Sequence, residues 1–119
     1  MKKILIVDDS ATVRQQVGMA LTQAGYGIVE AVDGLDALAK LDPSIALMIC
    51  DVNMPRLDGL STLEKMRTEG RWAAVPVVML TTEGIPALMA RAKAAGAKGW
   101  IIKPFKAELL VAAVKRLLA

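Results

Sequence analysis

ILIVDDS, residues 4–10, is the stretch that decides the fold, because a short apolar run ends abruptly in two carboxylates. Three further apolar runs also end in a chemically competent polar residue: IALMIC (45–50) before Asp51, VPVVML (75–80) before Thr81 and Thr82, and GWII (99–102) before Lys103. Short runs rich in β-branched residues that alternate with helical stretches are typical of the strands of a parallel α/β sheet. The sequence therefore predicts such a sheet.

The pattern is one strand followed by one helix, repeated five times. We predict strands at 3–8, 27–31, 45–50, 75–80 and 99–102. Ser10 is expected to cap the first helix, and the apolar residues of the second and third helices recur at helical spacing: Leu35, Leu38 and Leu41, then Leu60, Leu63 and Met66. Because parallel strands need right-handed crossovers, helices must cover both sheet faces, which gives a doubly wound five-stranded sheet with five helices.

Length and composition exclude several classes of protein. The 119 residues suffice for one domain with a real core, and no apolar run is long enough to span a bilayer. A single cysteine, Cys50, excludes an internal disulfide and fits a reducing compartment, with the thiol buried in a strand. The absence of histidine excludes histidine-based catalysis, so any phosphohistidine must come from a partner.

Charge is distributed unevenly along the chain. The net charge is +3, with an excess of negative residues up to position 83 and an excess of positive residues from 84 to 119. The basic end could attract an acidic partner. Nucleic acid is the less favoured partner, because the basic residues are scattered and few aromatic residues lie among them.

The polar residues that end the strands should converge, because ligands of open α/β sheets bind beyond the carboxyl ends of the strands. Two of the carboxylates of Asp8, Asp9 and Asp51, if about 4 Å apart, repel each other by roughly 4 kcal/mol at an effective dielectric near 20. A hard divalent cation relieves this repulsion, and Mg²⁺ suits a site with few protein oxygens better than Ca²⁺ does. Lys103 and Thr81 add an ammonium and a hydroxyl. This set suits a carboxylate that attacks a phosphoryl group and becomes an aspartyl phosphate.

At these residues the sequence resembles the response-regulator receiver domains of two-component signalling, and most closely the single-domain, CheY-type chemotaxis regulators. The resemblance covers essentially the whole chain and rests on four motifs: ILIVDDSATVR, CDVNMPRLDGL, VVMLTTEG and GAKGWIIKPF. It implies a flavodoxin-like fold with strand order 2-1-3-4-5. Residues 1–119 are then expected to form one receiver domain without an output domain.

The resemblance also implies a role for each matching residue. Asp51 is the expected phosphoacceptor, and Asp8, Asp9, Asp51 and the backbone carbonyl of Asn53 are the expected Mg²⁺ ligands. Lys103 is expected to contact the phosphoryl group. Thr81 and Trp100 are the expected switch residues, and the Lys103–Pro104 bond is expected to be cis. Asn53 and Glu83 border the pocket and could tune the phosphoryl lifetime.

These expectations describe a cytoplasmic, phosphorylation-activated regulator rather than an enzyme, one that assists its own phosphorylation and dephosphorylation. Its partners are a histidine kinase, as phosphodonor, and a downstream protein that binds a surface formed by the helix starting near Pro86, strand 99–102 and helix 105–118. The last helix is apolar nearly all round, so we expect Leu110 and Val114 to contribute to this surface or to a weak homodimer. The alternative is an ordinary amphipathic helix. No direct nucleic-acid contact and no membrane insertion are expected.

Other functions remain open. A receiver-like adaptor that binds its partner regardless of phosphorylation has no need of all five polar residues, and a phosphate sink or relay uses the same residues as a chemotaxis regulator. A flavodoxin-like cofactor binder is disfavoured because the loop Asp8–Ala11 is acidic and lacks glycine. A Mg²⁺ phosphohydrolase with an aspartyl nucleophile usually needs a substrate-binding cap, for which the chain has no insertion.

Overall fold

The computed structural model describes residues 1–70, 72–82 and 84–119, and in them strands and helices alternate along the chain. The elements are β1 (Lys3–Val7), α1 (Ala11–Gln23), β2 (Gly27–Ala31), α2 (Gly34–Lys40), β3 (Ile45–Asp51), α3 (Gly59–Thr68), β4 (Val77–Thr81), α4 (Pro86–Ala94), β5 (Gly99–Ile102) and α5 (Ala107–Leu117). The strands are parallel and lie in the order β2-β1-β3-β4-β5. The predicted doubly wound sheet and its strand order are confirmed.

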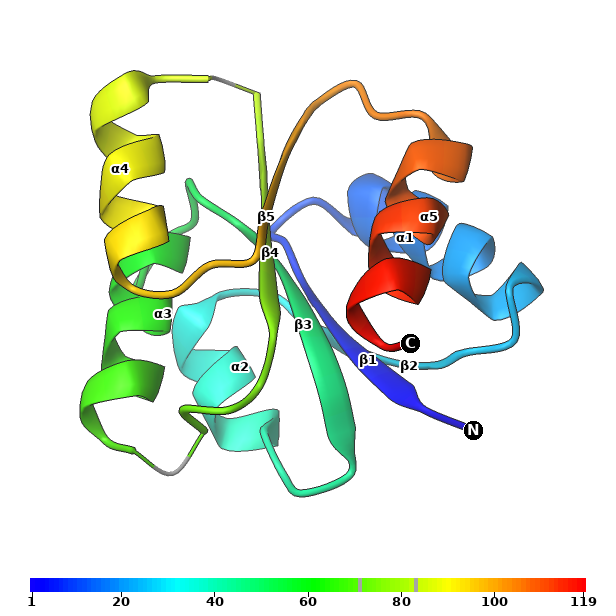
Figure 1. The fold of residues 1–119 in the computed structure, drawn as a ribbon, viewed down its shortest axis with the longest axis horizontal. Helices are drawn as coiled ribbons and strands as arrows, with labels where there is room; N and C mark the ends of the chain where they lie inside the picture. The colour runs from blue at the N-terminus through cyan, green and yellow to red at the C-terminus, as the bar shows by residue number, and fades with distance from the viewer. Residues whose placement is uncertain (71, 83) are drawn as a thin grey trace.

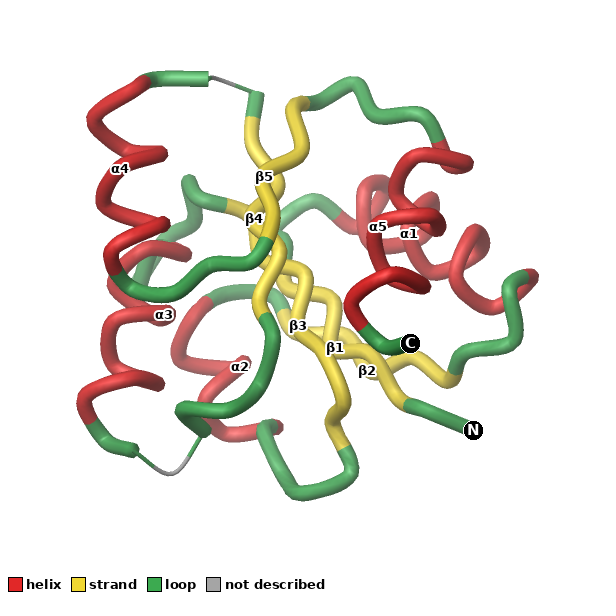
Figure 2. The backbone as a smooth tube through the Cα atoms, viewed as in Figure 1, coloured by secondary structure: helices red, strands yellow, loops and turns green. Residues whose placement is uncertain are grey.

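Helices cover both faces of the sheet. In Figure 1, where the sheet is seen nearly edge-on, α1 and α5 lie on one side and α2, α3 and α4 on the other. The tube in Figure 2 shows the strands stacked as one central layer between them. Strands buried on both faces need apolar side chains at successive positions, which explains the uninterrupted apolar runs of β1, β3 and β4.

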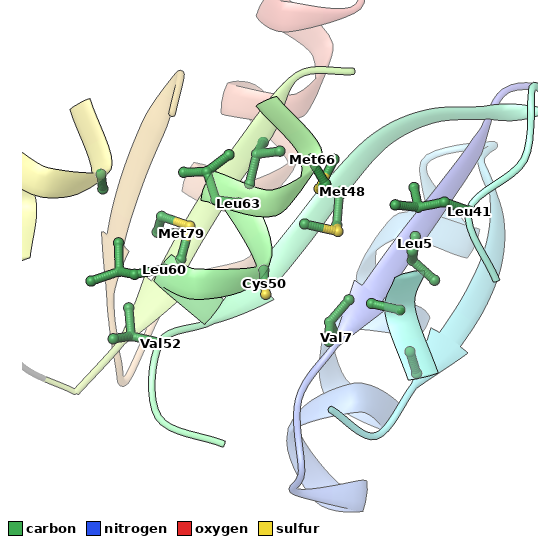
Figure 3. Packing of buried hydrophobic residues seen from close by; sticks show 14 of the residues in the cluster. Leu5, Val7, Leu41, Met48, Cys50, Val52, Leu60, Leu63, Met66 and Met79 are labelled. Carbon is green, nitrogen blue, oxygen red and sulfur yellow. The ribbon is translucent and has the colours of Figure 1, made fainter. Parts of the chain in front are cut away.

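Alternate residues of each strand point to opposite faces of the sheet and so belong to two separate core layers. Leu5 and Val7 of β1 join the layer under α2, α3 and α4, whereas Ile4 and Ile6 join the layer under α1 and α5. Figure 3 shows the first layer, in which Leu60, Leu63 and Met66 of α3 pack toward Met79 and Cys50. The predicted apolar face of the third helix is confirmed. Cys50 is a buried core thiol whose pKa is raised by burial.

Three helices begin with a polar side chain that caps the first turn. Ser10, Asp33 and Asp58 accept a hydrogen bond from the backbone N–H of the residue three positions later, at the starts of α1, α2 and α3. Such a cap stabilises a helix by about 1 kcal/mol. The Ser10 cap is confirmed, whereas the caps at Asp33 and Asp58 were not predicted from the sequence. The caps fix the helix starts at the sheet edge where the strands end.

The prediction that Leu110 and Val114 of α5 contribute to a contact surface was wrong. Leu110 and Val114 are fully buried in the layer under α1 and α5, whereas Leu109 is 63% exposed. Helical periodicity explains the result: residues 110 and 114 are four apart and share the face that meets the sheet, and Leu109 lies off that face. The helix is the ordinary amphipathic one that the sequence left as the alternative.

Two smaller expectations also need correction. Leu35 is 45% exposed, because α2 begins at Gly34 and turns Ala37 and the following Leu41 toward the core instead. Strand β4 begins at Val77, two residues later than predicted, since Pro76 has no N–H to contribute to a strand ladder. The strand ends at Thr81, so the hydroxyl expected after the strand belongs to its last residue.

Candidate phosphoryl-transfer site

The carboxyl ends of β1, β3, β4 and β5 meet at one edge of the sheet, at the top of Figure 1. Asp8 directly follows β1, Asp51 ends β3, Thr81 ends β4, and Lys103 directly follows β5. These residues are far apart in sequence, and parallel strands bring them to the same edge. The predicted convergence of polar side chains is therefore present in the fold.

Asp8, Asp9 and Asp51 form a compact group of carboxylates. Each offers an oxygen within 4.8 Å of the others, and no other group of three acidic residues in the described part of the chain lies this close together. Asp8 is only 1% exposed and Asp51 5% exposed, whereas Asp9 is exposed. Three oxygens from two buried carboxylates and one open one fit a hard divalent cation that keeps several waters, as Mg²⁺ does.

Lys103 provides the ammonium that contacts this group. Its Nζ lies 2.9 Å from Oδ2 of Asp8 and 3.3 Å from Oδ1 of Asp51. Burial would lower the pKa of Lys103, but the hydrogen bond to Asp8 and the charge of Asp51 outweigh it and raise the pKa above the ordinary value. Lys103 therefore stays charged. One ammonium beside three carboxylates leaves the edge with an excess of negative charge.

The Asp51 carboxyl group shows the effect of that excess. Burial is the largest cause that raises its pKa, the neighbouring charge of Asp8 adds to it, and Lys103 lowers it only in part. The ionised form of Asp51 is thus less favourable here than in water. A divalent cation or a bound cationic group would offset this penalty.

The backbone around Asp8 is held by contacts that the sequence did not predict. Asp8 Oδ1 accepts from the backbone N–H of Ser10 (2.8 Å), and the Asp8 carbonyl accepts from Arg14 Nη1 (2.7 Å). Arg14 also pairs with Glu30 at 3.1 Å. Asp8 thus keeps Oδ2 for Lys103, while its Oδ1 and carbonyl are bound by the start of α1 and its N–H donates to the carbonyl of Ala31 at the end of β2. Arg14 is the last residue of the motif ILIVDDSATVR, but the sequence alone does not show that a helix turn brings it back over Asp8.

Gly59 is a second structural requirement at the site. A Cβ on this residue would lie only 2.0 Å from the carbonyl oxygen of Asp51, and its N–H donates to the carbonyl of Val52 at 2.9 Å. Glycine alone lets the start of α3 approach the end of β3 this closely. Gly59 lies within the motif CDVNMPRLDGL, but the sequence alone does not show this close approach.

Thr81 and Trp100, the expected switch residues, lie on neighbouring strands and face the same side of the sheet. Trp100 pairs in register with Met79 and packs in the layer under α4, and Thr81, two residues beyond Met79, points to that side because side chains alternate along a strand. Thr81 is buried, and its carbonyl accepts from the Lys103 N–H at 2.6 Å. The indole Nε1 of Trp100 is buried and has no hydrogen-bond partner among the described residues.

The remaining expected residues lie around the acidic group or outside the described ranges. Asn53 is exposed in the loop that follows β3, two residues after Asp51. Glu83 lies outside the described residues. The Lys103–Pro104 peptide bond is cis, as expected. A cavity of about 490 Å³ opens beside Lys103; its lining also includes Val13, Gln16, Thr82, Pro104, Phe105 and Ala107.

No helix in the described ranges combines the length and apolarity needed to cross a membrane.

Comparisons with known proteins place these residues in context. A family model described as the response regulator receiver domain matches residues 4–115. The chemotaxis protein CheY1 of Helicobacter pylori is 39% identical over 111 residues, which cover 91% of this chain and 90% of that protein. A chemotaxis protein CheY homolog of Campylobacter jejuni is 37% identical over 91% of this chain and 85% of its own length.

Solved structures of a chemotaxis protein and of a receiver domain are also similar to this chain. The Vibrio cholerae chemotaxis protein CheY4 superposes with a TM-score of 0.92, at 41% identity over 99% of both chains. The receiver domain of NtrX from Brucella abortus superposes with a TM-score of 0.87 at 34% identity over 97% of both chains.

Proposed function

Because the chain belongs to the response regulator receiver domain family, we propose that Asp51 accepts a phosphoryl group from a partner histidine kinase and thereby switches a protein-binding surface. The observation that carries this proposal is the position of Lys103, whose Nζ contacts both Asp8 and Asp51 beside the cluster of three carboxylates. This position puts the ammonium beside the carboxylate that would receive the phosphoryl group, where it could contact phosphoryl oxygens.

The proposed transfer is a displacement at phosphorus. An Asp51 carboxylate oxygen forms the new P–O bond while the P–N bond of the donor phosphohistidine breaks, and the departing imidazole nitrogen takes the electron pair. Lys103 and the Thr81 hydroxyl then donate hydrogen bonds to phosphoryl oxygens. Mg²⁺, held by Asp8, Asp9, Asp51 and the carbonyl of Asn53, would neutralise charge on the phosphoryl oxygens when bound.

The same residues are proposed to assist dephosphorylation by hydrolysis. Attack of water on the phosphorus of the acyl phosphate releases phosphate and restores the Asp51 carboxylate. Asn53 and Glu83 are the proposed determinants of the phosphoryl lifetime. Receiver domains are signalling regulators rather than enzymes in the usual sense, so these steps serve to set and reset a signal.

The proposed switch links the site to the surface of α4, β5 and α5. A phosphoryl group on Asp51 adds charge and acceptor oxygens that can draw the Thr81 hydroxyl toward it. Trp100 lies on the same sheet side and has a buried indole N–H without a partner among the described residues, so its present position is not fully satisfied. A change at Thr81 can therefore shift Trp100 and the neighbouring α4.

The exposed apolar residues of that surface are Ile85, Met89, Ile102 and Leu109. They replace Leu110 and Val114 as the proposed contact residues, whether the partner is a downstream protein or a second copy in a weak homodimer. The CheY proteins of H. pylori and C. jejuni are chemotaxis proteins, and we propose a cytoplasmic role in chemotaxis here as well. No direct contact with nucleic acid is proposed.

The decisive experiment is intact mass spectrometry after rapid acid quench, with acetyl phosphate as donor. We expect wild type to gain one phosphoryl group in Mg²⁺ and none in EDTA, and Asp51→Asn to gain none in either. Asp42→Asn is a matched control, because Asp42 is an exposed aspartate outside the acidic group whose carboxylate accepts hydrogen bonds from Ser44. No phosphoryl group on wild type in Mg²⁺ would favour the adaptor that works without phosphorylation.

Tryptophan fluorescence tests the switch in the same samples. We expect a change on phosphorylation of wild type that Trp100→Phe abolishes, although Trp72 still fluoresces. Mass gain without any such change would favour a phosphate sink or relay over a conformational switch.

A further inference from the structure

The loop between β3 and α3, residues 52–58, contains a strained turn centred on Arg56. Arg56 has φ of 64°, and within the described part of the chain it is the sole residue other than glycine with positive φ. The N–H of Leu57 donates to the carbonyl of Pro55 at 2.7 Å, so the hydrogen bond spans Arg56 alone. This is the γ-turn with positive φ, which is rare and unfavourable. A residue other than glycine keeps this conformation only where surrounding contacts enforce it.

The enforcing contact comes from the start of α2. Arg56 Nε lies 2.6 Å from Oδ2 of Asp33, and Asp33 is buried. The other carboxylate oxygen of Asp33, Oδ1, accepts from the N–H of Asp36 at 2.8 Å and caps α2. Asp33 therefore has one oxygen fixed by its own helix and the other directed at the loop. The hydrogen bond from Arg56 and that from Asp36 lower the pKa of Asp33, so it is charged at neutral pH.

A second contact fixes the next residue of the loop. The N–H of Gly34 donates to the carbonyl of Leu57 at 3.1 Å. A Cβ on Gly34 would lie 2.6 Å from that carbonyl oxygen and closer still to Thr62, so no larger residue fits. The adjacent residues Asp33 and Gly34 thus hold the adjacent residues Arg56 and Leu57.

The other end of the loop is fixed by the sheet. Val52 donates its N–H to the carbonyl of Leu80 (3.2 Å) and accepts at its own carbonyl from Gly59 (2.9 Å). Only residues 53–55 lie between this point and Arg56. The path of Asn53 is therefore determined from both sides, by the strand before it and by the Asp33–Arg56 contact after it.

We propose that Asp33 and Arg56 are positioning residues that preset the Asn53 backbone for a divalent cation, and so set the cation affinity of the Asp8–Asp9–Asp51 cluster. This inference rests on the proposed function, in which the Asn53 carbonyl is a ligand. Neither Asp33 nor Arg56 touches the cation. They act by holding the loop in a conformation that the isolated chain would avoid.

The test is the Mg²⁺ dissociation constant, measured by isothermal titration calorimetry on the whole chain. Asp33→Asn retains an acceptor for Asp36 but presents an amide donor to Arg56. Arg56→Gln removes the charge at similar length. We expect each to weaken Mg²⁺ binding about tenfold, as loss of a residue that orients a ligand usually does. The double variant should be no weaker than either single variant, because both break one contact.

Two further variants separate positioning from general stability. Arg91→Gln breaks the Arg91–Glu64 ion pair between α4 and α3, at 2.6 Å, without touching the loop, and should leave Mg²⁺ affinity within about twofold. Arg56→Lys keeps a cation opposite Asp33 and should recover most of the lost affinity. Thermal unfolding in EDTA verifies that every variant is folded before titration.

Wild-type Mg²⁺ affinity in both Asp33→Asn and Arg56→Gln would overturn the inference and leave the proposed function intact. Failure of the proposed function can also be distinguished from failure of this inference. If wild type binds Mg²⁺ but acquires no phosphoryl group, the proposed function fails, while tenfold weaker binding in the two variants still supports positioning.

Discussion

Lys103 and Arg67 are two partly buried cations at opposite edges of the same sheet, and the protein satisfies them in opposite ways. Lys103, at the carboxyl edge, contacts the carboxylates of Asp8 and Asp51. Arg67, near the end of α3 at the amino edge, makes no ion pair with any described residue. Its guanidinium donates instead to backbone carbonyls, those of Trp72, Ala73, Val75, Ala95 and Gly96.

This difference in partners indicates that the amino edge, with Arg67, is structural and the carboxyl edge, with Lys103, is functional. Arg67 joins the loop before β4 to the end of α4, where helix carbonyls favour a positive charge, and the guanidinium donors are used. Burial lowers the pKa of Arg67, but no opposing charge is needed to keep it protonated. At the carboxyl edge, one ammonium faces three carboxylates, and the pKa of Asp51 is raised by burial and by Asp8. At the amino edge, hydrogen bonds to backbone carbonyls satisfy the Arg67 guanidinium. The carboxyl edge keeps an excess of negative charge, which a bound cationic ligand would relieve.

The largest expected effect comes from Lys103→Met. Removing the ammonium should slow phosphorylation by acetyl phosphate about 100-fold or more, because one charged donor to the phosphoryl oxygens is lost. Mg²⁺ should bind more tightly, since the cation no longer shares Asp8 and Asp51 with Lys103. Rates from quenched mass spectrometry and affinities from calorimetry check both parts. Weaker Mg²⁺ binding would show that Lys103 organises the carboxylates rather than competing for them.

Arg67→Met should have the next largest effect, on stability instead of chemistry. We expect the free energy of unfolding to fall by roughly 2–4 kcal/mol, as for loss of a buried hydrogen-bond network, with an unchanged phosphorylation rate in the folded protein. Arg91→Met is the control: it removes an exposed ion pair of α3 and α4 and should cost about 1 kcal/mol or less. A slower phosphorylation rate in folded Arg67→Met would mean that the two edges are not independent.

A smaller effect is expected from pH at Asp33. Its folded-state pKa is depressed by the Arg56 and Asp36 hydrogen bonds, so the stabilisation is present above the unfolded pKa, about 4, and is lost as pH falls through the folded pKa. Asp33→Asn should therefore be less stable than wild type at pH 7, and the difference should shrink below pH 4. Urea unfolding across this range measures it. Arg56→Gln should follow the same profile, and a pH-independent difference would contradict the assignment.

The sequence predicted the functional edge better than the contacts that support it. Asp8, Asp51 and Lys103 could be placed together because every parallel strand ends at the same edge. Asp33–Arg56 and the Arg67 network could not, since each joins loops whose conformations follow from packing rather than from periodicity. The composition of α5 also did not predict which of its residues are buried. Because the helix is almost wholly apolar, its sequence does not show that Leu110 faces the core and Leu109 the solvent.

The central claim is that the carboxyl edge holds unrelieved negative charge, and urea unfolding of wild type and Asp51→Asn in EDTA and in Mg²⁺ tests it most directly. In EDTA we predict that Asp51→Asn is the more stable protein, because a carboxylate whose pKa is raised by burial and by the charge of Asp8 is removed. Saturating Mg²⁺, at about 100 times its dissociation constant, should stabilise wild type by about 2.7 kcal/mol and the variant far less. Wild type that is more stable than Asp51→Asn in EDTA, and unaffected by Mg²⁺, would contradict the account.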